Sequence, residues 1–271
     1  GLSLQDHLMD FTETVREKSR VQFDQQSDQY SRGHILEETG DLAEARVHLG
    51  LTGRQSLLDV ATGAGHTAVF FAKLGCEVTA VDISERMLEA TDARAAAAGI
   101  PISTRCSPAE KLPFDDASFD LVTCRLAAHH FACPASFCME VARVLKPGGR
   151  LLLIDGTVED GETEAESWIH EVESLRDPSH NRFVSPDRWT HLCGHVGLRV
   201  IHQRLQPFKQ PDLDWYFDVA NTSEENRAAV RRLVAEAPRP ARKVFGVKEE
   251  SGKWVWWWQR LTLVARKLKS N

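Results

Sequence analysis

Apolar and polar positions in the middle of this chain form alternating blocks that predict strands and helices in turn. Short apolar runs of strand length occur at residues 56–60, 77–81, 102–105, 119–123 and 150–154. Helical patterns fill the intervals between them, at residues 67–74, 85–98 and 134–145. Strands that alternate with helices at this spacing predict right-handed βαβ units. The expected fold is therefore α/β, with a mostly parallel sheet covered by helices on both faces.

Before and after this core, strands and helices no longer alternate regularly, so these segments predict additions to the sheet. Helical patterns over residues 4–19 and 35–49 indicate an N-terminal helical cap, which we bound at residues 2–50. The core then spans residues 51–155. The remaining residues, 156–271, are expected to form a lid insertion and the last two strands of the sheet.

The last part of the chain carries its own boundary signals. Residues 162–175 are helical in pattern, and Ser185 and Ser223 are each placed to cap a further helix. A strand is expected near 198–205 and a long final strand at about 254–266. Because the final strand follows a long excursion, it is expected to pair antiparallel, at the edge of the sheet.

Composition narrows the class of protein. The chain has 271 residues, of which 42% are hydrophobic and 27% charged, which is ordinary for a globular protein. A formal net charge of −6 argues against a protein whose main role is to bind nucleic acid. Six cysteines form no CxxC pair, and no stretch approaches the ~18 apolar residues of a membrane span. We therefore expect a cytoplasmic protein with reduced cysteines, no metal site and no membrane span.

The most informative segment runs from Asp59 to Ala68, where a predicted strand gives way to a helix. Gly63 and Gly65 let the backbone turn tightly there and approach a ligand closely. Asp82 ends the next predicted strand, where a carboxylate can accept hydrogen bonds from both hydroxyls of a ribose, each contributing about 1.5–3 kcal/mol. This combination predicts a nucleoside-type ligand at the carboxyl edge of the sheet.

Two kinds of cofactor satisfy this pattern. A dinucleotide such as NAD would place its pyrophosphate at the start of the helix, whereas a methionine-type ligand brings a cationic ammonium and sulfonium. The carboxylate of Asp59, four residues before Gly63, would repel the pyrophosphate and attract the cations. The sequence favours S-adenosyl-L-methionine, and an NAD-dependent oxidoreductase stays open as the alternative.

Further motifs accompany the glycine loop and Asp82 in a fixed order. They are Ala109-Glu110-Lys111-Leu112-Pro113-Phe114, Ser118-Phe119-Asp120-Leu121-Val122 and Val144-Leu145-Lys146-Pro147-Gly148-Gly149. Together they resemble the class I S-adenosylmethionine-dependent methyltransferases, in the branch of the ubiquinone/menaquinone C-methyltransferases. The likeness lies mostly in residues 56–155. The stretches 127–131 and 175–180 look closer to an uncharacterised bacterial subgroup of that branch.

The resemblance implies a Rossmann-like sheet of seven strands, the last antiparallel, with the cofactor on its carboxyl edge. The methionyl part would lie over the glycine loop, the ribose on Asp82, the adenine beside Ile83 and Met87, and the sulfonium near Arg125. The expected cofactor-binding residues are Phe23, Tyr30, Asp59, Ala61, Thr62, Gly63, Gly65, Asp82, Ile83, Met87, Ala109, Glu110, Arg125 and Leu126.

Two of these expectations come with a qualification from the sequence. Family members commonly have Gly-Asp before the Ala-Glu pair, whereas this chain has Ser107-Pro108, so the role of the missing aspartate would pass to Glu110 or to the backbone. Phe23 and Tyr30 lie in a segment that resembles a family element folded over the cofactor. The same segment also reads as an ordinary polar loop with two core aromatics.

Histidines are the candidate catalytic groups. Methyl transfer depends mainly on positioning and water exclusion, but an acceptor that must lose a proton needs a base. His130 and His129, just past the fourth predicted strand, are best placed for that role, with His130 ahead. The competing interpretation is that one packs and the other binds backbone. His66 is expected to contact the cofactor or lie exposed on a helix, and His191 and His195 are read as surface residues.

Aromatic residues near the end of the chain permit two interpretations. Trp254, Trp256 and Trp258 share one face of the predicted final strand and Trp257 the other, which is typical of sheet packing. Some of them, with Trp215, Tyr216 and Phe217, could instead line a pocket for the methyl acceptor.

Taken together, the sequence predicts a methyltransferase, monomeric or homodimeric, that acts on a small apolar or aromatic molecule. Its core sheet would bind the cofactor, and the N-terminal helices with residues 156–250 would cover the acceptor. A protein that binds the cofactor without catalysis stays open as well, because no acceptor-side residue is diagnostic.

Overall fold

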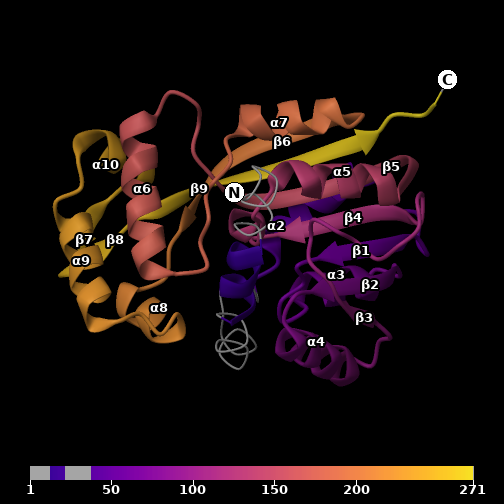
Figure 1. The fold of residues 1–271 in the computed structure, drawn as a ribbon, viewed down its shortest axis with the longest axis horizontal. Coiled ribbons are helices and arrows are strands. Elements are labelled where there is room, and N and C mark those ends of the chain that lie inside the picture. Colours follow the sequence, from indigo (N-terminus) through magenta and orange to yellow (C-terminus); the bar gives the residue numbers. More distant parts are fainter. Residues whose placement is uncertain (1–12, 22–37, 271) are drawn as a thin grey trace, which may run out of the picture.

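The computed structural model describes residues 13–21 and 38–270, and its centre is a single twisted sheet of seven strands in the order β3-β2-β1-β4-β5-β9-β6 (Figure 1). β1 to β5 pair in parallel, and β9 pairs antiparallel with both β5 and β6. The strands are β1 Ser56–Val60, β2 Glu77–Asp82, β3 Ser103–Cys106, β4 Phe119–Arg125, β5 Leu145–Thr157, β6 Leu198–Lys209 and β9 Trp257–Lys267.

This sheet confirms the predicted fold class and corrects one detail of it. The last strand is antiparallel, as expected, but it lies inside the sheet rather than at its edge. β9 is long enough to bond to β5 on one side, from Arg266 to Gln259, and to β6 on the other, from Lys267 to Trp257. Both of its hydrogen-bonding edges are therefore used, and β6 is left as the edge strand.

Helices cover both faces because the apolar strands present alternate side chains to opposite sides. Leu57 packs on the face covered by α2 (Gly40–Ala45) and α3 (His66–Lys73). Leu58 packs on the other face, with α5 (Pro134–Val144) and α7 (Pro186–His195). α4 (Glu85–Ala98) packs beside β2, β3 and α3, and Met87 N–H donates to the Ser84 hydroxyl at its start.

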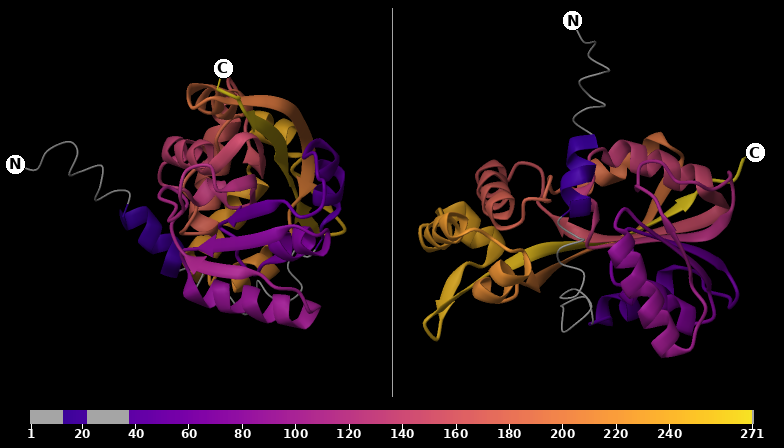
Figure 2. Two further views of the ribbon diagram at one scale, coloured as in Figure 1. Left: turned by 90° about the vertical axis from the view of Figure 1, so that its right-hand side faces the viewer. Right: turned by 60° about the horizontal axis from the view of Figure 1, so that its bottom comes forward.

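A lid of short elements lies at one end of the sheet. It comprises α6 Thr163–Arg176, α8 Leu213–Val219, α9 Glu224–Ala235, α10 Arg239–Phe245 and the hairpin of β7 Lys248–Glu250 with β8 Lys253–Val255. These elements share a hydrophobic cluster that includes Trp168, Phe217, Phe245 and Trp256. β6 and β9 are continuous from the sheet into this lid (Figure 2).

Both predicted helix caps are present, since the hydroxyls of Ser185 and Ser223 accept backbone N–H groups in α7 and α9. Several boundaries of helices and strands differ from those expected. The predicted helix at 35–49 is shorter in its described part, where α2 is followed by a 3-10 turn, η2 Arg46–His48. The final strand is interrupted at Trp256, so that Trp254 belongs to the hairpin. α8, α10 and β7 were not predicted, because segments of 7 and 3 residues are too short for periodicity to register.

None of the helices in the described ranges is long and apolar enough to cross a membrane.

Candidate functional site

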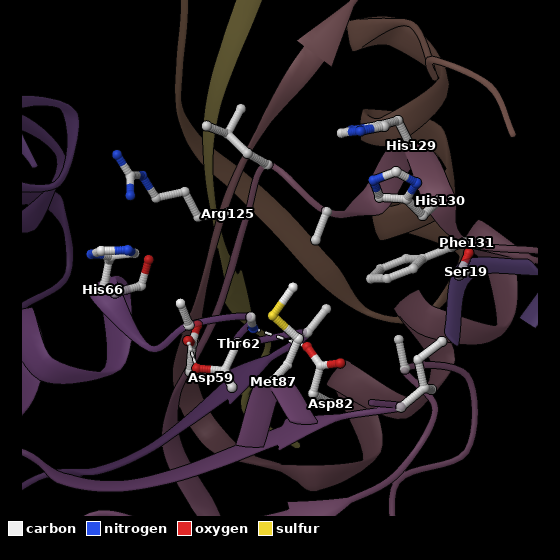
Figure 3. Close-up of a pocket in the computed structure, with 18 of the residues that line it drawn as sticks. Ser19, Asp59, Thr62, His66, Asp82, Met87, Arg125, His129, His130 and Phe131 are labelled. Atoms are coloured by element: carbon white, nitrogen blue, oxygen red, sulfur yellow. Dashed lines mark hydrogen bonds between the residues drawn. The ribbon is translucent and has the colours of Figure 1, made fainter. Parts of the chain in front are cut away.

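A large cavity lies at the carboxyl ends of β1, β2 and β4, between the sheet and the lid (Figure 3). The space within it is about 1290 Å³, including space open to solvent at its mouth. Among the expected site residues, those that line it are Asp59, Ala61, Thr62, Gly63, Asp82, Ile83, Met87, Ala109, Glu110, Arg125, Leu126, His129 and His130. Gly65 is not among the lining residues, and Phe23 and Tyr30 lie outside the described residues.

The glycine loop after β1 takes its shape from a run of left-handed backbone. Ala61, Gly63 and Gly65 have φ of 54°, 57° and 88°. Such a conformation costs a residue with a Cβ of order 1–3 kcal/mol, and such strain clusters at functional sites. Leu126, just after β4, is also left-handed, with φ of 54°, and lines the same cavity. The two strand ends nearest the cavity centre are thus both bent to open it.

Asp82 fixes the loop as well as facing the cavity. Its Oδ2 accepts from Gly63 N–H at 2.9 Å and its Oδ1 from Ser84 N–H at 2.9 Å. The hydroxyl of Thr91 donates to the Gly63 carbonyl at 2.7 Å from the α4 side. The carboxylate expected to hold a ribose therefore also holds the loop that would carry the rest of the nucleoside ligand.

Asp59 lies under the loop and is 1% exposed. Its two oxygens accept from the hydroxyls of Thr62 at 2.6 Å and Thr123 at 2.7 Å. Burial raises the pKa of Asp59 to about 6, although the two threonine bonds and the charge of Arg125 oppose that rise. A carboxylate this poorly solvated is stabilised by a cationic ligand.

Arg125 lines the cavity, but its guanidinium is bonded away from the centre. Nε and Nη2 donate to the carboxylate of Asp41 at 2.8 and 3.1 Å, and Nη2 also donates to the Glu38 carbonyl. Arg125 and Asp41 are 8% and 7% exposed, so the ion pair is largely out of water. The pair attaches α2 to the end of β4, and sequence reasoning missed it because the two residues are far apart in the chain. His66, which Figure 3 shows on the same side as Arg125, lines the cavity and is buried.

The opposite rim is formed by Glu110 and by a helical segment over residues 13–21. Glu110 accepts from Ala132 N–H at 3.0 Å and lies 3.4 Å from Nε of Arg16. Ser19 lines the cavity from the same segment, 3% exposed, and its hydroxyl has no hydrogen-bond partner among the described residues. Ser107, which precedes the proline that stands where an aspartate is common, lines the cavity with its hydroxyl turned to the Pro108 and Lys111 carbonyls. Nothing in the sequence pattern marked Arg16 and Ser19 as site residues.

The two histidines lie on η3 (Ala128–His130), across the cavity from Asp59 and Asp82 (Figure 3). Nδ1 of His129 lies 2.7 Å from Oδ1 of Asp155, which can only accept when ionised, so Nδ1 carries the proton. In the neutral ring Nε2 then holds the lone pair, and His129 lines the cavity. Burial lowers the pKa of His129, but Asp155, with Asp177 and Glu173 behind it, raises it above the ordinary value overall.

His130 is held by Ser179, which is itself bonded to the carboxylate of Asp177. Its Nδ1 lies 2.9 Å from the Ser179 carbonyl, which again makes Nδ1 the protonated nitrogen. The Ser179 hydroxyl donates to Asp177 at 2.6 Å, and the Tyr216 hydroxyl donates to the same carboxylate at 3.2 Å. Burial lowers the pKa of His130, so this ring is neutral near pH 7.

The part of the cavity next to the histidines is aromatic. Its lining includes Phe131, Phe208, Tyr216 and Trp258, and the Trp258 ring lies 5.4 Å from that of His129, edge to face. Trp256 and Trp258 both pack in the lid cluster, as expected for sheet and lid packing, and Trp258 also lines the cavity. Asp155, Phe208 and Gln210 were missed as site residues. For Asp155 there was a signal, because it ends a strand at the same edge as Asp59 and Asp82.

The expectation that His191 and His195 are surface residues is confirmed. Their Nε2 atoms lie 2.9 Å apart on the exposed face of α7, and neither residue lines the cavity. No group of three or more metal-binding side chains occurs in the part of the chain that the structure describes.

Comparison with known proteins gives a consistent picture. A family model described as "Methyltransferase domain" matches residues 58–153. Over 225 residues the chain is 35% identical to the uncharacterized methyltransferase YcgJ of Bacillus subtilis, covering 82% of this chain and 88% of the relative. It is 34% identical over 137 residues to the ubiquinone/menaquinone biosynthesis C-methyltransferase UbiE of Cupriavidus metallidurans, covering 49% of this chain and 55% of that protein.

Solved structures agree with this. The YcgJ crystal structure superposes with a TM-score of 0.78 at 28% identity, covering 86% of this chain and 100% of that one. A putative methyltransferase of Bacillus halodurans has a TM-score of 0.79 at 31% identity, covering 84% of this chain and 99% of its own.

Proposed function

Since this chain belongs to the S-adenosylmethionine-dependent methyltransferase family, we propose that it methylates a small aromatic or apolar molecule bound between His129 and the lid. The observation that carries the proposal is the His129–Asp155 pair, which faces an aromatic-lined cavity at the sheet edge where the cofactor belongs. S-adenosylmethionine supplies an activated methyl group on a cationic sulfur. The protein supplies position, water exclusion and, where the acceptor needs it, a base.

The residues around the glycine loop fit that cofactor. Asp82 presents a carboxylate at the ribose position and Ile83 and Met87 an apolar surface for the adenine, with Glu110 at its edge. Asp59 offers a buried carboxylate beneath the cationic methionyl end. The same buried charge argues against a pyrophosphate there, so the NAD-dependent alternative is not favoured.

The acceptor half of the cavity favours a flat, apolar ring. Phe131, Phe208, Tyr216 and Trp258 give faces and edges for aromatic stacking, which contributes about 0.5–1.5 kcal/mol per pair beyond burial. Two relatives are named as a demethylmenaquinone methyltransferase and a ubiquinone/menaquinone biosynthesis C-methyltransferase, names that refer to quinone-type acceptors. Each of them aligns with 49% of this chain. That similarity supports a ring-shaped acceptor here.

His129 is the better candidate base. Its Nδ1–H is held by Asp155, so Nε2 can accept a proton from an acceptor hydroxyl while the new bond to the methyl carbon forms and the carbon–sulfur bond breaks. The nearby carboxylate stabilises the imidazolium that results. His130, whose pKa is lowered by burial, is a weaker base and is placed to orient the acceptor.

The first test is ligand-dependent thermal unfolding. Saturating S-adenosylhomocysteine, at ~100 times its dissociation constant, should stabilise the protein by about 2.7 kcal/mol, which raises Tm by roughly 5 °C in a chain of this size. NAD should give no shift. A shift with NAD alone would contradict the cofactor assignment.

The base is tested on a panel of phenols, naphthols and hydroquinones. Asp155→Asn keeps an oxygen that can accept from His129 Nδ1–H and Gly156 N–H but removes the negative charge that stabilises the imidazolium. Turnover should therefore fall about tenfold or more, with S-adenosylhomocysteine affinity unchanged. Asp160→Asn, exposed on the loop after the same strand, is the matched control. Full turnover by Asp155→Asn would rule out His129 as the base. Cofactor binding with no turnover of any acceptor by the wild type would favour a non-catalytic binding protein.

A further inference from the structure

Arg176 and Glu173, near the end of α6, form a buried ion pair directly behind the acceptor side of the cavity, with exposed fractions of 0% and 1%. We propose that this pair positions the cavity wall and thereby determines which acceptors the enzyme takes. Neither residue lines the cavity, so the role is exerted through the side chains that do. The inference rests on the proposed function for the kind of acceptor that binds, but the contacts of the pair with the cavity wall do not depend on that function.

Three side chains of the wall come from three different segments and all meet at this pair. The Gln210 Oε1 accepts from Arg176 Nη2 at 3.2 Å. The Tyr216 ring lies 3.9 Å from the guanidinium carbon of Arg176. The Trp258 indole N–H donates to Glu173 Oε1 at 2.8 Å. Because Gln210, Tyr216 and Trp258 line the cavity, the pair fixes their relative positions.

The pair also connects the wall to the proposed base. Trp258, bonded to Glu173, makes the edge-to-face contact with the His129 ring. Asp177, the residue after Arg176, accepts from the Tyr216 hydroxyl and from Ser179, which holds His130. A displacement of the end of α6 would therefore move both the wall and the two histidines.

Stability alone does not account for such a pair. Removing two charges from water costs several kcal/mol each, and an apolar pair of similar volume is often as stable or more so. Burial raises the pKa of Glu173 in spite of the adjacent guanidinium, which shows that desolvation is not fully offset. Nη1 of Arg176 is buried with no hydrogen-bond partner in the described residues. These costs are explained if the pair is kept for the geometry it imposes.

The geometry requires arginine specifically. The guanidinium carbon lies 3.9 and 4.8 Å from the ring centroids of Tyr216 and Trp256, while Nη2 donates to both oxygens of Glu173. A planar guanidinium can contact aromatic rings and donate to a carboxylate at the same time, whereas the compact ammonium of lysine can neutralise Glu173 but cannot also stack on a ring. Arg176→Lys therefore keeps the charge and removes the positioning.

The experiment compares wild type, Arg176→Lys and the control Arg231→Lys. Arg231 also lies over a lid aromatic, Phe217 at 5.3 Å, but on the exposed surface beside Asp214. Binding of 2-naphthol to the protein saturated with S-adenosylhomocysteine is measured by calorimetry. We expect Arg176→Lys to weaken 2-naphthol binding at least tenfold, with S-adenosylhomocysteine affinity within twofold of wild type, and Arg231→Lys to change neither.

A second readout needs no acceptor. The indole N–H resonance of Trp258, assigned by its loss in Trp258→Phe, should shift in Arg176→Lys, while that of Trp189 in the core stays in place. An unchanged Trp258 resonance would overturn the proposal. So would equal losses of 2-naphthol and S-adenosylhomocysteine affinity, because they would mean a merely structural role.

A second variant and the second readout distinguish a failure to fold from a failure of the proposed function. If Arg176→Lys does not fold, the double variant Glu173→Gln/Arg176→Met removes both charges at similar size, and the same criteria apply. If wild type binds no 2-naphthol, the proposed acceptor class fails, and the Trp258 resonance still decides whether the pair holds the wall.

Discussion

Replacing Asp59 by asparagine removes a charge that the fold buries beneath the glycine loop. The amide has the size of the carboxyl, and its oxygen and NH₂ can still bond to the hydroxyls of Thr62 and Thr123, which lie 2.6 and 2.7 Å from the carboxylate. The substitution therefore changes charge with little change in packing. It separates the contribution of Asp59 to stability from its contribution to ligand binding.

The magnitude follows from the pKa. The carboxyl of Asp59 has a pKa of 3.8 in the absence of the fold and about 6 within it, because burial disfavours the charged form. Each pKa unit corresponds to about 1.4 kcal/mol. Above pH 6 the buried charge of Asp59 therefore lowers the free energy of unfolding by about 3 kcal/mol. We expect Asp59→Asn to recover most of this at pH 7.5, which is a rise in Tm of roughly 5 °C.

The pH dependence of stability tests independently whether the charge of Asp59 destabilises the folded protein. A raised carboxyl pKa means that the folded protein binds the proton more tightly, so this cost is absent below pH 3.8 and complete above pH 6. The gain from Asp59→Asn should therefore shrink as the pH falls from 6 towards 4. Asp115→Asn, at an exposed position, is the control and should show no such trend.

Ligand binding should move in the opposite direction. A cationic methionyl group stabilises the charged form of Asp59, so Asp59→Asn should bind S-adenosylmethionine at least tenfold more weakly while unfolding at higher temperature. In the wild type, affinity should fall by up to tenfold per pH unit below 6. Calorimetric titration and thermal unfolding over pH 4–8 measure both effects. A lower Tm for Asp59→Asn, or a pH-independent difference, would refute the reasoning.

Two further substitutions test the loop itself. Gly65→Ala should destabilise the protein by about 1–3 kcal/mol and weaken S-adenosylhomocysteine binding, because φ is 88° and a Cβ would lie 2.9 Å from the Thr91 side chain. Gly161→Ala is its control, since φ is 89° there but nothing lies within 4 Å, and equal effects of the two would contradict a role for the Thr91 contact. Asp82→Ala removes the acceptor of Gly63 and Ser84 N–H, so it should raise the dissociation constant of S-adenosylhomocysteine at least tenfold and lower Tm as well. Unchanged affinity would mean that the ribose does not bind there.

Local sequence signals predicted the sheet and the glycine loop because the forces that form them are local. Apolar runs of strand length, Ser84 at the start of α4 and Gly99 at its end specify β2 and α4 within a few residues. Asp59 and Asp82 end adjacent parallel strands, and parallel strands bring their carboxyl ends to one edge. Their convergence on one cavity follows from topology.

The direction of the site's longer side chains could not be predicted in the same way. Arg125 lines the cavity where the sequence places it, but its ion pair with Asp41 could not be predicted, because that pair depends on where α2 packs. The sequence ranks His130 ahead of His129 as a candidate base, and our proposal of His129 rests on Asp155, which becomes its neighbour only when β5 pairs with β4. The Arg176–Glu173 pair was invisible as a site element, since its meaning comes from three residues contributed by β6, α8 and β9 and the loops between them.

The two long strands β6 and β9 explain how the cofactor half and the acceptor half keep their relative positions. Leu261 and Leu263 of β9 belong to the core under the sheet, whereas Trp258 of the same strand belongs to the lid cluster and lines the cavity. In β6, Leu198 packs in the core and Phe208 pairs with Trp258 at the lid end. Because both strands are hydrogen-bonded over most of their length, we expect the aromatic wall of the cavity to keep its distance from the glycine loop. The side chains that face the acceptor can then vary while the sheet, and with it the cofactor site, stays the same.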